Sequence, residues 1–323
     1  MSHRPFVSVI CPTYNRARFL PYLCHMFNIQ TYPANRRELI ILDDSPQSNE
    51  AIINKENKDK NIRYIYHPEK LKLGEKRNML NNLAKEKGEY IVCMDDDDYY
   101  PPEKIQKAVD LLISRKGKEK ITGSSEMYIY FTALDQMYVF KKLGPNHATN
   151  GTFVYHRSLL KDHGYEDNAK MAEEKFFLKE YTTPMVQSNA LSSIICIAHH
   201  SNTFDKMKIL GQLQLANKKF KHVVKDKRLL EFYKELKEES KREIEIRKKK
   251  EAEEDEMYDT LVNLNQVPFI VSEDKKIPIR KRDDGSLYVK LPNGMEGDVT
   301  RDEQGLVITM PNKEQIRLSQ NTP

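Results

Sequence analysis

The fold of this chain is decided by the stretch GEYIVCMDDDDYYPP, residues 88–102. Its first part, residues 90–94, is a short apolar run with β-branched members, which is typical of a buried β-strand. Four consecutive aspartates follow at once, and the two prolines behind them are typical of a helix start. The stretch therefore predicts a buried strand that delivers carboxylates to the edge of a sheet.

Three similar apolar runs precede this stretch, at residues 6–10, 39–42 and 63–66. Helical patterns separate them at residues 17–30, 49–58 and 74–87. Strand–helix alternation at this spacing predicts an α/β fold with a mostly parallel sheet flanked by helices. Ligands of such sheets bind at the carboxyl ends of the strands, so the polar residues there are the candidates for function.

Composition excludes several classes of protein. The chain has 323 residues, only four cysteines and 12 glycines, so neither a disulfide scaffold nor a collagen-like fold is expected. Its net charge of +5 is too small to predict a nucleic-acid partner. No apolar run approaches the roughly 18–20 residues of a membrane-spanning helix. The first residues lack the apolar stretch of a signal peptide, so we expect a cytoplasmic protein with reduced cysteines.

The charged residues are concentrated in one segment. Residues 217–260 hold 27 charged side chains in 44 positions and no glycine or proline, which predicts one long helix. A heptad seam is not sustained, so a solvated spacer helix is favoured over a coiled-coil dimer. Contact between copies of the chain, through this helix or the segment after it, is the alternative.

Short β-rich runs alternate with turn signals over residues 267–318, which predicts a small β-meander of about five strands. It carries no cluster of catalytic residue types. We therefore expect three parts: a catalytic domain at residues 1–212, a long charged helix or linker at 213–264, and a β-rich appendage at 265–323.

The aspartates after the strand predict a metal site. Adjacent carboxylates repel one another and raise each other's pKa, and a divalent cation would relieve that repulsion. Strand alternation would place Asp95 and Asp97 on one face and Asp96 and Asp98 on the other. An oxygen-rich site suits Mg²⁺ or Mn²⁺, which also bind substrate phosphates. No P-loop or dinucleotide-binding glycine motif is present, and Lys76 and Arg77 at a helix start could meet a diphosphate.

Together these motifs resemble those of the family 2 glycosyltransferases. The resemblance lies in VICPTYNR at residues 9–16, ILDDS at 41–45, Gly74 with KRN at 76–78, and residues 88–102, and it covers about residues 5–205. It implies the GT-A nucleotide-sugar-binding fold, a sugar donor that is a UDP-sugar, and Mn²⁺ or Mg²⁺ as the metal.

The resemblance also implies roles for individual residues. The loop after the first strand and Asp43 would hold the base, Arg77 the base or phosphates, Asp96 the ribose, and Asp97 with Asp95 the metal. It places these residues in the donor site: Pro12, Thr13, Tyr14, Asn15, Asp43, Asp44, Lys76, Arg77, Asn78, Asp95 and Asp96.

A catalytic base is expected 70–100 residues after the metal motif. Glu173 and Glu174 stand at that distance, and Glu174 falls where the family usually has aspartate, so the choice between the two stays open. A late histidine completes the metal shell in some GT-A enzymes, and either His199 or His200 could serve, although a plain polar loop is an equal alternative.

These observations predict a metal-dependent, inverting glycosyltransferase that moves a sugar from a nucleotide-sugar donor to the hydroxyl of a glycan or protein acceptor. One alternative is a nucleotide-binding or assembly module without transferase activity. A nucleotidyltransferase is a third, and the glycine-rich loop that such enzymes often use is absent.

Overall fold

The structure is a computed structural model and describes residues 4–58, 60–84, 86–169, 172–263, 266–272, 275–291, 294–302 and 305–317. The chain forms two compact units, Met1–Lys241 and Arg242–Pro323. Each unit is described by itself, beginning with the first, which holds all the predicted site residues.

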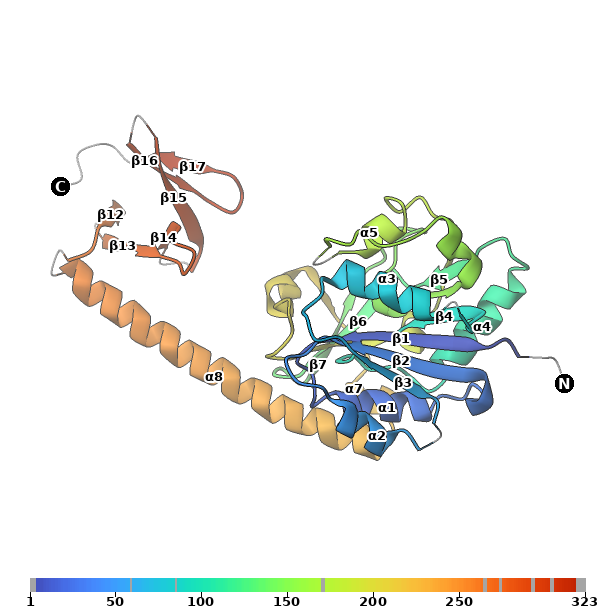
Figure 1. The fold of residues 1–323 in the computed structure, drawn as a ribbon. Helices are drawn as coiled ribbons and strands as arrows, with labels where there is room; N and C mark the ends of the chain where they lie inside the picture. Colours follow the sequence, from blue (N-terminus) through green and yellow to red (C-terminus); the bar gives the residue numbers. More distant parts are fainter. Residues whose placement is uncertain are drawn as a thin grey trace. The chain divides into compact units, whose positions relative to one another are not determined.

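The first unit is built on a seven-stranded sheet with the order β3-β2-β1-β4-β8-β5-β9 (Figure 1). Strands β1 to β4 all run parallel, whereas β8 is antiparallel to both of its neighbours. The mostly parallel sheet predicted from the apolar runs is therefore confirmed. The strands are β1 (Val7–Thr13), β2 (Arg37–Asp43), β3 (Ile62–Tyr66), β4 (Tyr90–Cys93), β5 (Ile121–Gly123), β8 (Val154–His156) and β9 (Val186–Gln187).

Helices cover both faces of this sheet because successive side chains of β1 point to opposite sides. Val9 lies in the core beneath α1 (Leu20–Asn28), while Ile10 lies in the core beneath α3 (Leu73–Ala84). Figure 1 shows α1 and α3 on opposite sides of the sheet. Other helices of the first unit are α2 (Glu50–Glu56), α4 (Lys104–Ser114), α5 (Glu174–Phe177) and α6 (Ala190–Ser193).

A second, four-stranded sheet lies in the same unit, with the order β10-β6-β7-β11. Its strands are β6 (Met127–Phe131), β7 (Gln136–Phe140), β10 (Ile195–Ala198) and β11 (Gln214–Leu215). An isolated bridge between Tyr99 and Ile195 ties β10 to the chain just after the four aspartates. The second sheet therefore forms one wall beside the carboxyl end of β4.

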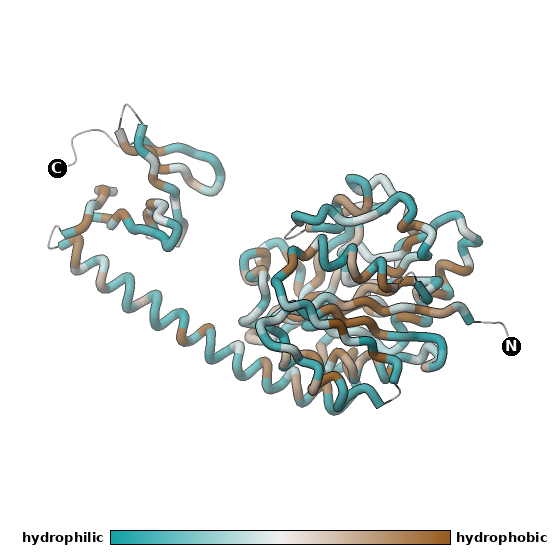
Figure 2. The backbone as a smooth tube through the Cα atoms, viewed as in Figure 1, coloured by the Kyte–Doolittle hydropathy of each residue, from teal (hydrophilic) through white to brown (hydrophobic). Residues whose placement is uncertain are grey.

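The charged segment forms two helices, α7 (Phe220–Val223) and α8 (Lys227–Asn263), instead of the one helix expected over residues 217–260. The break lies at Val224, which is fully buried in an extended conformation. Asp226 then begins α8, because its Oδ1 accepts a hydrogen bond from the Leu229 amide at 3.0 Å. Figure 2 shows α8 mostly in hydrophilic colours, as its composition predicts. Within the described residues, no helix is long and apolar enough to cross a membrane.

The second unit contains an antiparallel meander of six strands, where the sequence predicts about five. The additional strand, β12, pairs with β13. The strands are β12 (Phe269–Ser272), β13 (Lys275–Lys281), β14 (Leu287–Lys290), β15 (Glu296–Asp302), β16 (Gly305–Thr309) and β17 (Gln315–Arg317). Of the predicted turns and strands, residues 292, 293, 303, 304 and 318 lie outside the described residues.

The first turn of α3 requires glycine at position 74. A Cβ atom there would lie 1.8 Å from the backbone carbonyl oxygen of Glu166. Gly74→Ala is therefore expected to lower the free energy of unfolding by about 2–4 kcal/mol, because a backbone segment has to move. Urea denaturation measures this. Gly144→Ala is the matched control, since a Cβ at Gly144 meets nothing within 4 Å; equal losses in both variants would contradict the prediction.

Candidate active site

A cavity of about 410 Å³ opens at the carboxyl ends of β1 and β4. Ten predicted site residues line it: Pro12, Thr13, Tyr14, Lys76, Arg77, Asp95, Asp96, Asp97, Glu173 and Glu174. The structure thus brings together side chains that are up to 162 positions apart in the sequence. Six other predicted site residues, all within the described ranges, are not part of its lining: Asn15, Asp43, Asp44, Asn78, His199 and His200.

The loop after β1 is fixed to both neighbouring strand ends. Thr13 Oγ1 donates a hydrogen bond to Asp96 Oδ2 at 2.5 Å. Asn15 adopts a left-handed backbone conformation with φ 54°, and its amide donates to Ser45 Oγ at 2.7 Å. The loop therefore turns sharply at Asn15, which leaves the ring of Tyr14 on the cavity wall, 4.0 Å from Lys70 Nζ.

Asp43, at the end of β2, has its carboxylate occupied within the protein. Its Oδ2 accepts hydrogen bonds from Tyr64 Oη at 2.6 Å and Asn49 Nδ2 at 2.8 Å, and its Oδ1 accepts from Ser45. The side chain is fully buried. Asp43 thus holds the β2 and β3 ends together, one layer behind the cavity.

Asp44 forms a buried ion pair with Lys76 of α3. The Asp44 side chain is 0% exposed and the Lys76 side chain 6%. Lys76 Nζ also donates to the Thr13 carbonyl oxygen at 2.9 Å, and Asp44 Oδ2 accepts from the Leu71 amide at 2.7 Å. The pair therefore locks the start of α3 to the loop after β1.

Lys76→Met is expected to lower the free energy of unfolding by about 3–5 kcal/mol, because it leaves the buried Asp44 carboxylate without its counter-ion. Chemical denaturation measures the loss. Asp44→Asn in the Lys76→Met background should recover part of it, since a neutral amide needs no counter-ion. Lys72→Met is the surface control, expected to stay within about 0.5 kcal/mol. No recovery in the double variant would argue against a charge effect.

The four aspartates follow β4 in a bend, because the strand ends at Cys93. The strand alternation expected for them is therefore wrong, and all four line the same cavity. Burial and the charge of Asp97 raise the pKa of Asp96 well above its usual range. The same two causes raise the pKa of Asp98 to about 7, and its Oδ1 accepts a hydrogen bond from the Ile197 amide at 2.8 Å.

The surroundings of Asp97 keep its carboxylate charged. Burial opposes its charge, but the hydrogen bond with His199 and the positive charges of Lys206 and Arg16 lower its pKa to about 2. His199 Nε2 lies 3.2 Å from Asp97 Oδ2. His200 instead contacts Ser240 of α8. Of the two histidines, the structure thus brings His199 to the acidic cluster.

Asp97 Oδ2 and His199 Nε2 are spaced to hold a divalent cation together in place of the Asn202 amide, whose Nδ2 lies 3.2 Å from the first atom and 2.9 Å from the second. Two neighbouring ligands at about 2.1 Å from one metal lie about 3 Å apart, close to the 3.2 Å between Asp97 Oδ2 and His199 Nε2. Ser201 Oγ lies 3.0 Å from His199 Nδ1, where it can orient the ring. In the described part of the chain, no three His, Cys, Asp or Glu side chains form a ready-made metal site. Further ligands would therefore come from phosphate and water.

Arg77 of α3 connects the acidic cluster to the glutamate pair. Its Nε donates to Glu173 Oε1 at 2.7 Å and its Nη2 to Asp95 Oδ1 at 3.0 Å. The buried Nη1 has no hydrogen-bond partner within the described residues. Asn78, the next residue of α3, does not face the cavity. Its side-chain amide makes two hydrogen bonds with the backbone of Tyr165. Arg77 therefore lines the cavity and still has one N–H group, at Nη1, that is available as a hydrogen-bond donor to a ligand.

The two glutamates lie in different environments. Glu173 is held by Arg77 and by Asn150 Nδ2 at 3.3 Å. Glu174 lines the cavity, and within the described residues it has no ion pair. Burial, reinforced by the charge of Glu173, raises the pKa of Glu174 to about 7. The structure thus separates a fixed carboxylate from one that can exchange a proton near neutral pH.

Backbone strain surrounds the short helix α5 that carries Glu174. Ala172 before it has φ 53°, and Lys179, Glu180 and Tyr181 after it have φ 49°, 56° and 60°. Three successive left-handed residues are unusual for residues with side chains. A stacked contact of Tyr181 on His147, with ring centroids 4.5 Å apart, helps to hold this left-handed turn.

Several lining residues are not among the individual site residues predicted from the sequence, although the segment from Asn150 to Arg157 is predicted to be a strand on the acceptor side. Asn150 and Gly151 come from the 3₁₀ turn η2 (Asn150–Thr152), where buried Lys104 Nζ donates to the Gly151 carbonyl oxygen at 2.7 Å. Arg16 is the last residue of the motif at residues 9–16, and its Nη2 lies 3.7 Å from Asp97 Oδ2. The motif was identified, but the role of Arg16 beside Asp97 was not predicted. Lys206 lies outside all the motifs, and nothing in its neighbouring sequence indicates a place in the cavity. The remaining unpredicted residues are Leu73, Asp98, Met127, Thr149, Ile194, Cys196, Asn202, Thr203 and Phe204.

The model of the family described as "Glycosyl transferase family 2" matches residues 8–164. A Bacillus subtilis glycosyltransferase assigned to teichuronic acid biosynthesis, TuaG, is 30% identical over 41% of this chain and 52% of its own length. The Staphylococcus aureus poly(ribitol-phosphate) β-N-acetylglucosaminyltransferase TarS is 27% identical over 54% of this chain and 32% of its own. The chain thus spans about half or less of the curated relatives it matches.

The fold is also found in a solved structure. A mannosyltransferase of Pyrobaculum calidifontis, determined with GDP-Man and Mn²⁺, superposes with a TM-score of 0.50 at 15% identity. The match covers 62% of this chain and 59% of that enzyme. The first unit therefore has the GT-A fold that the sequence resemblance implied, and residues 8–164 of this chain are similar to glycosyl transferase family 2.

Proposed function

We propose that this protein is a metal-dependent, inverting glycosyltransferase that moves a sugar from a nucleotide-sugar donor to an acceptor hydroxyl. One observation carries the proposal: a single cavity holds a charged aspartate beside a histidine, a buried arginine with an unused donor, and a glutamate with a pKa of about 7. These are the groups needed to bind a metal-diphosphate and to remove a proton.

The donor is expected to lie along the carboxyl end of the sheet. Thr13 and Tyr14 would contact the base, Asp96 the ribose, and Arg77 the diphosphate. Asp97 and His199 would hold Mn²⁺ or Mg²⁺, with Asp95 close by. When bound, the metal supplies charge stabilisation for the leaving nucleoside diphosphate. Asp43 and Asp44 would support the site from behind, since both carboxylates are occupied within the protein.

Glu174 is the proposed general base, and Glu173 the residue that positions Arg77. The Glu174 carboxylate would take the proton of the acceptor hydroxyl while the oxygen of that hydroxyl forms its bond to the anomeric carbon. The bond from that carbon to the diphosphate oxygen breaks on the opposite side, so a single displacement inverts the anomeric centre. A carboxylate with a pKa near 7 is well suited, because a large part of it is deprotonated at neutral pH while it is still basic enough to take a proton.

We further propose residues 1–212 as the catalytic domain, 213–264 as a linking helix and 265–323 as an appendage for interaction or assembly. The acceptor is proposed to be the hydroxyl of a glycan or protein. A homo-oligomer through the helix at 217–260 or the appendage would be seen by light scattering.

A screen of nucleotide sugars tests the proposed function. UDP-GlcNAc, UDP-glucose and GDP-mannose are incubated with the protein in Mn²⁺, Mg²⁺ or EDTA, and release of the nucleoside diphosphate is followed. We expect slow hydrolysis with a UDP-sugar that requires the metal. Calorimetry with UDP and Mn²⁺ complements it: no metal-dependent binding would favour a module without transferase activity.

A further inference from the structure

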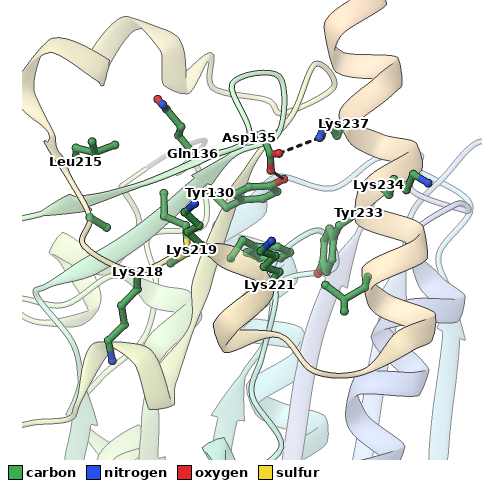
Figure 3. A pocket seen from close by; sticks show the side chains of 14 residues that line it. Tyr130, Asp135, Gln136, Leu215, Lys218, Lys219, Lys221, Tyr233, Lys234 and Lys237 are labelled. Atoms are coloured by element: carbon green, nitrogen blue, oxygen red, sulfur yellow. Dashed lines mark hydrogen bonds and ion pairs between the residues drawn. The ribbon is translucent and has the colours of Figure 1, made fainter.

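A second cavity, of about 580 Å³, lies in the first unit away from the aspartates. Its walls come from β6, β7, the segment from β11 to α7, and the first turns of α8 (Figure 3). None of its lining residues lines the candidate active site. It has a size typical of ligand-binding pockets.

The second cavity is strongly basic. Five lysines line it, and one carboxylate, Asp135, accompanies them, so four positive charges are uncompensated. Asp135 pairs with Lys237 at 2.9 Å, the contact drawn dashed in Figure 3. The other four lysines have no carboxylate partner within the described residues: Lys218, Lys219, Lys221 and Lys234. Figure 3 shows the ammonium groups of Lys219 and Lys221 near the aromatic residues of the cavity, whereas those of Lys218 and Lys234 are directed away from them. Two like charges held near one another attract anions.

The floor of the second cavity is aromatic and closely packed. Tyr130 stacks on Phe220 with ring centroids 4.0 Å apart and an interplanar angle of 9°. Tyr233 meets Phe220 edge-on at 5.1 Å. Because Tyr130, Phe220 and Tyr233 are all buried, their faces are not free to stack on the bases of a nucleic acid. The floor gives a rigid base on which exposed lysines are arranged.

The cation type indicates which anion fits. The lining contains lysine and no arginine. Arginine binds carboxylate and phosphate groups alike through two parallel hydrogen bonds, whereas lysine acts as a point charge, so an all-lysine lining favours a ligand of high charge density such as a polyphosphate. We propose that this cavity binds a ligand carrying two or more phosphate groups, at a place separate from the nucleotide-sugar site and independent of metal.

Strand β6 connects the two cavities. Met127 lines the candidate active site, and Tyr130, three positions later, lines the second cavity. Three residues of strand span about 10 Å. A phosphate-bearing ligand would therefore sit close to the transfer site without entering it.

Calorimetry with inorganic tripolyphosphate in EDTA tests the proposal on the full chain. In Lys219→Gln/Lys221→Gln, we expect affinity to fall by about tenfold, since two charges next to the ligand are lost. The matched control, Lys225→Gln/Lys227→Gln, removes two exposed lysines of the same segment outside the cavity and should change affinity less than twofold. Equal losses in both pairs would overturn the proposal.

Three further arms define the ligand. Citrate, with a similar charge on carboxylates, should bind at least fivefold more weakly, and equal binding would overturn the phosphate assignment. Saturating UDP in the same EDTA buffer should leave tripolyphosphate binding unchanged, whereas competition would place it in the donor site and overturn the proposal. Vesicles containing phosphatidic acid separate the sources. Vesicle binding that is lost in the Lys219/Lys221 double variant assigns the phosphate to a lipid headgroup, and tripolyphosphate binding alone assigns it to a soluble ligand.

Discussion

Replacing Glu174 by glutamine is expected to lower the rate of sugar transfer by about 10²–10⁴-fold, the usual contribution of a positioned general base. The amide keeps the size of the side chain but cannot accept the proton of the acceptor hydroxyl. Steady-state kinetics with the active nucleotide sugar measures kcat and KM separately. We expect the loss in kcat, with KM for the donor within about threefold.

Glu173→Gln distinguishes the two glutamates. Because Glu173 holds Arg77 at 2.7 Å, its loss should weaken donor binding and raise KM for the donor. Glu75→Gln, an exposed glutamate of α3 outside the cavity, controls for the loss of a carboxylate. Full activity in Glu174→Gln would move the base elsewhere.

The pH dependence follows from the same carboxyl group. With a pKa of about 7, Glu174 becomes a base only as the pH rises, so the rate should increase through pH 7 and then level off. Stability should change in the opposite sense. The raised pKa favours the protonated folded state, so its stabilising contribution is complete below about 4.5 and is lost as the pH rises through 7. Glu174→Gln should therefore be more stable than wild type at pH 8, by about 2–3 kcal/mol, and similar at pH 4.

The second large effect is expected for Asp97→Asn. The substitution keeps the shape of the side chain and removes the charge that the surroundings hold at a pKa of about 2. A metal contributes several kcal/mol of charge stabilisation to a leaving group, so metal-dependent turnover should fall by about 10²–10⁴-fold. A Mn²⁺ titration of activity should also show at least tenfold weaker apparent metal affinity.

Asp162→Asn is the control for Asp97→Asn, because Asp162 is exposed and lies outside the cavity. Calorimetry with UDP separates two causes of a loss. UDP binding without metal should be nearly unchanged in Asp97→Asn, whereas the additional affinity that Mn²⁺ confers should disappear. Unaltered metal dependence of turnover would remove Asp97 from the metal site.

The central strands could be predicted because each is an apolar run that the fold buries on both faces. All seven positions of β1 are buried, and a strand that is buried on both faces is visible in the sequence as a near-continuous apolar run. The break between α7 and α8 could not be predicted, because it depends on the burial of Val224 against distant residues. In the sequence, the apolar residues keep their helical spacing across this break.

The site shows the same limit. The motifs identified which strand ends meet, and the cavity contains most of the residues they carry. They did not reveal that Asp43 is held by Tyr64 and Asn49, since those partners lie on later elements. Lys206 lowers the pKa of Asp97 from 109 positions away. The choice of Glu174 over Glu173 as the base rests on Arg77, a partner that only the folded chain brings to Glu173.

The left-handed turn at residues 179–181 stores backbone strain close to Glu174. Each left-handed residue costs roughly 1–2 kcal/mol relative to the right-handed form. The contacts of the segment offset this cost: the Thr183 amide donates to the Leu178 carbonyl oxygen at 3.1 Å, and the side chains of Phe177 and Leu178 are fully buried in the core. The position of Glu174 at the cavity therefore depends on how the short helix packs on the core behind it, and not on the donor half of the site.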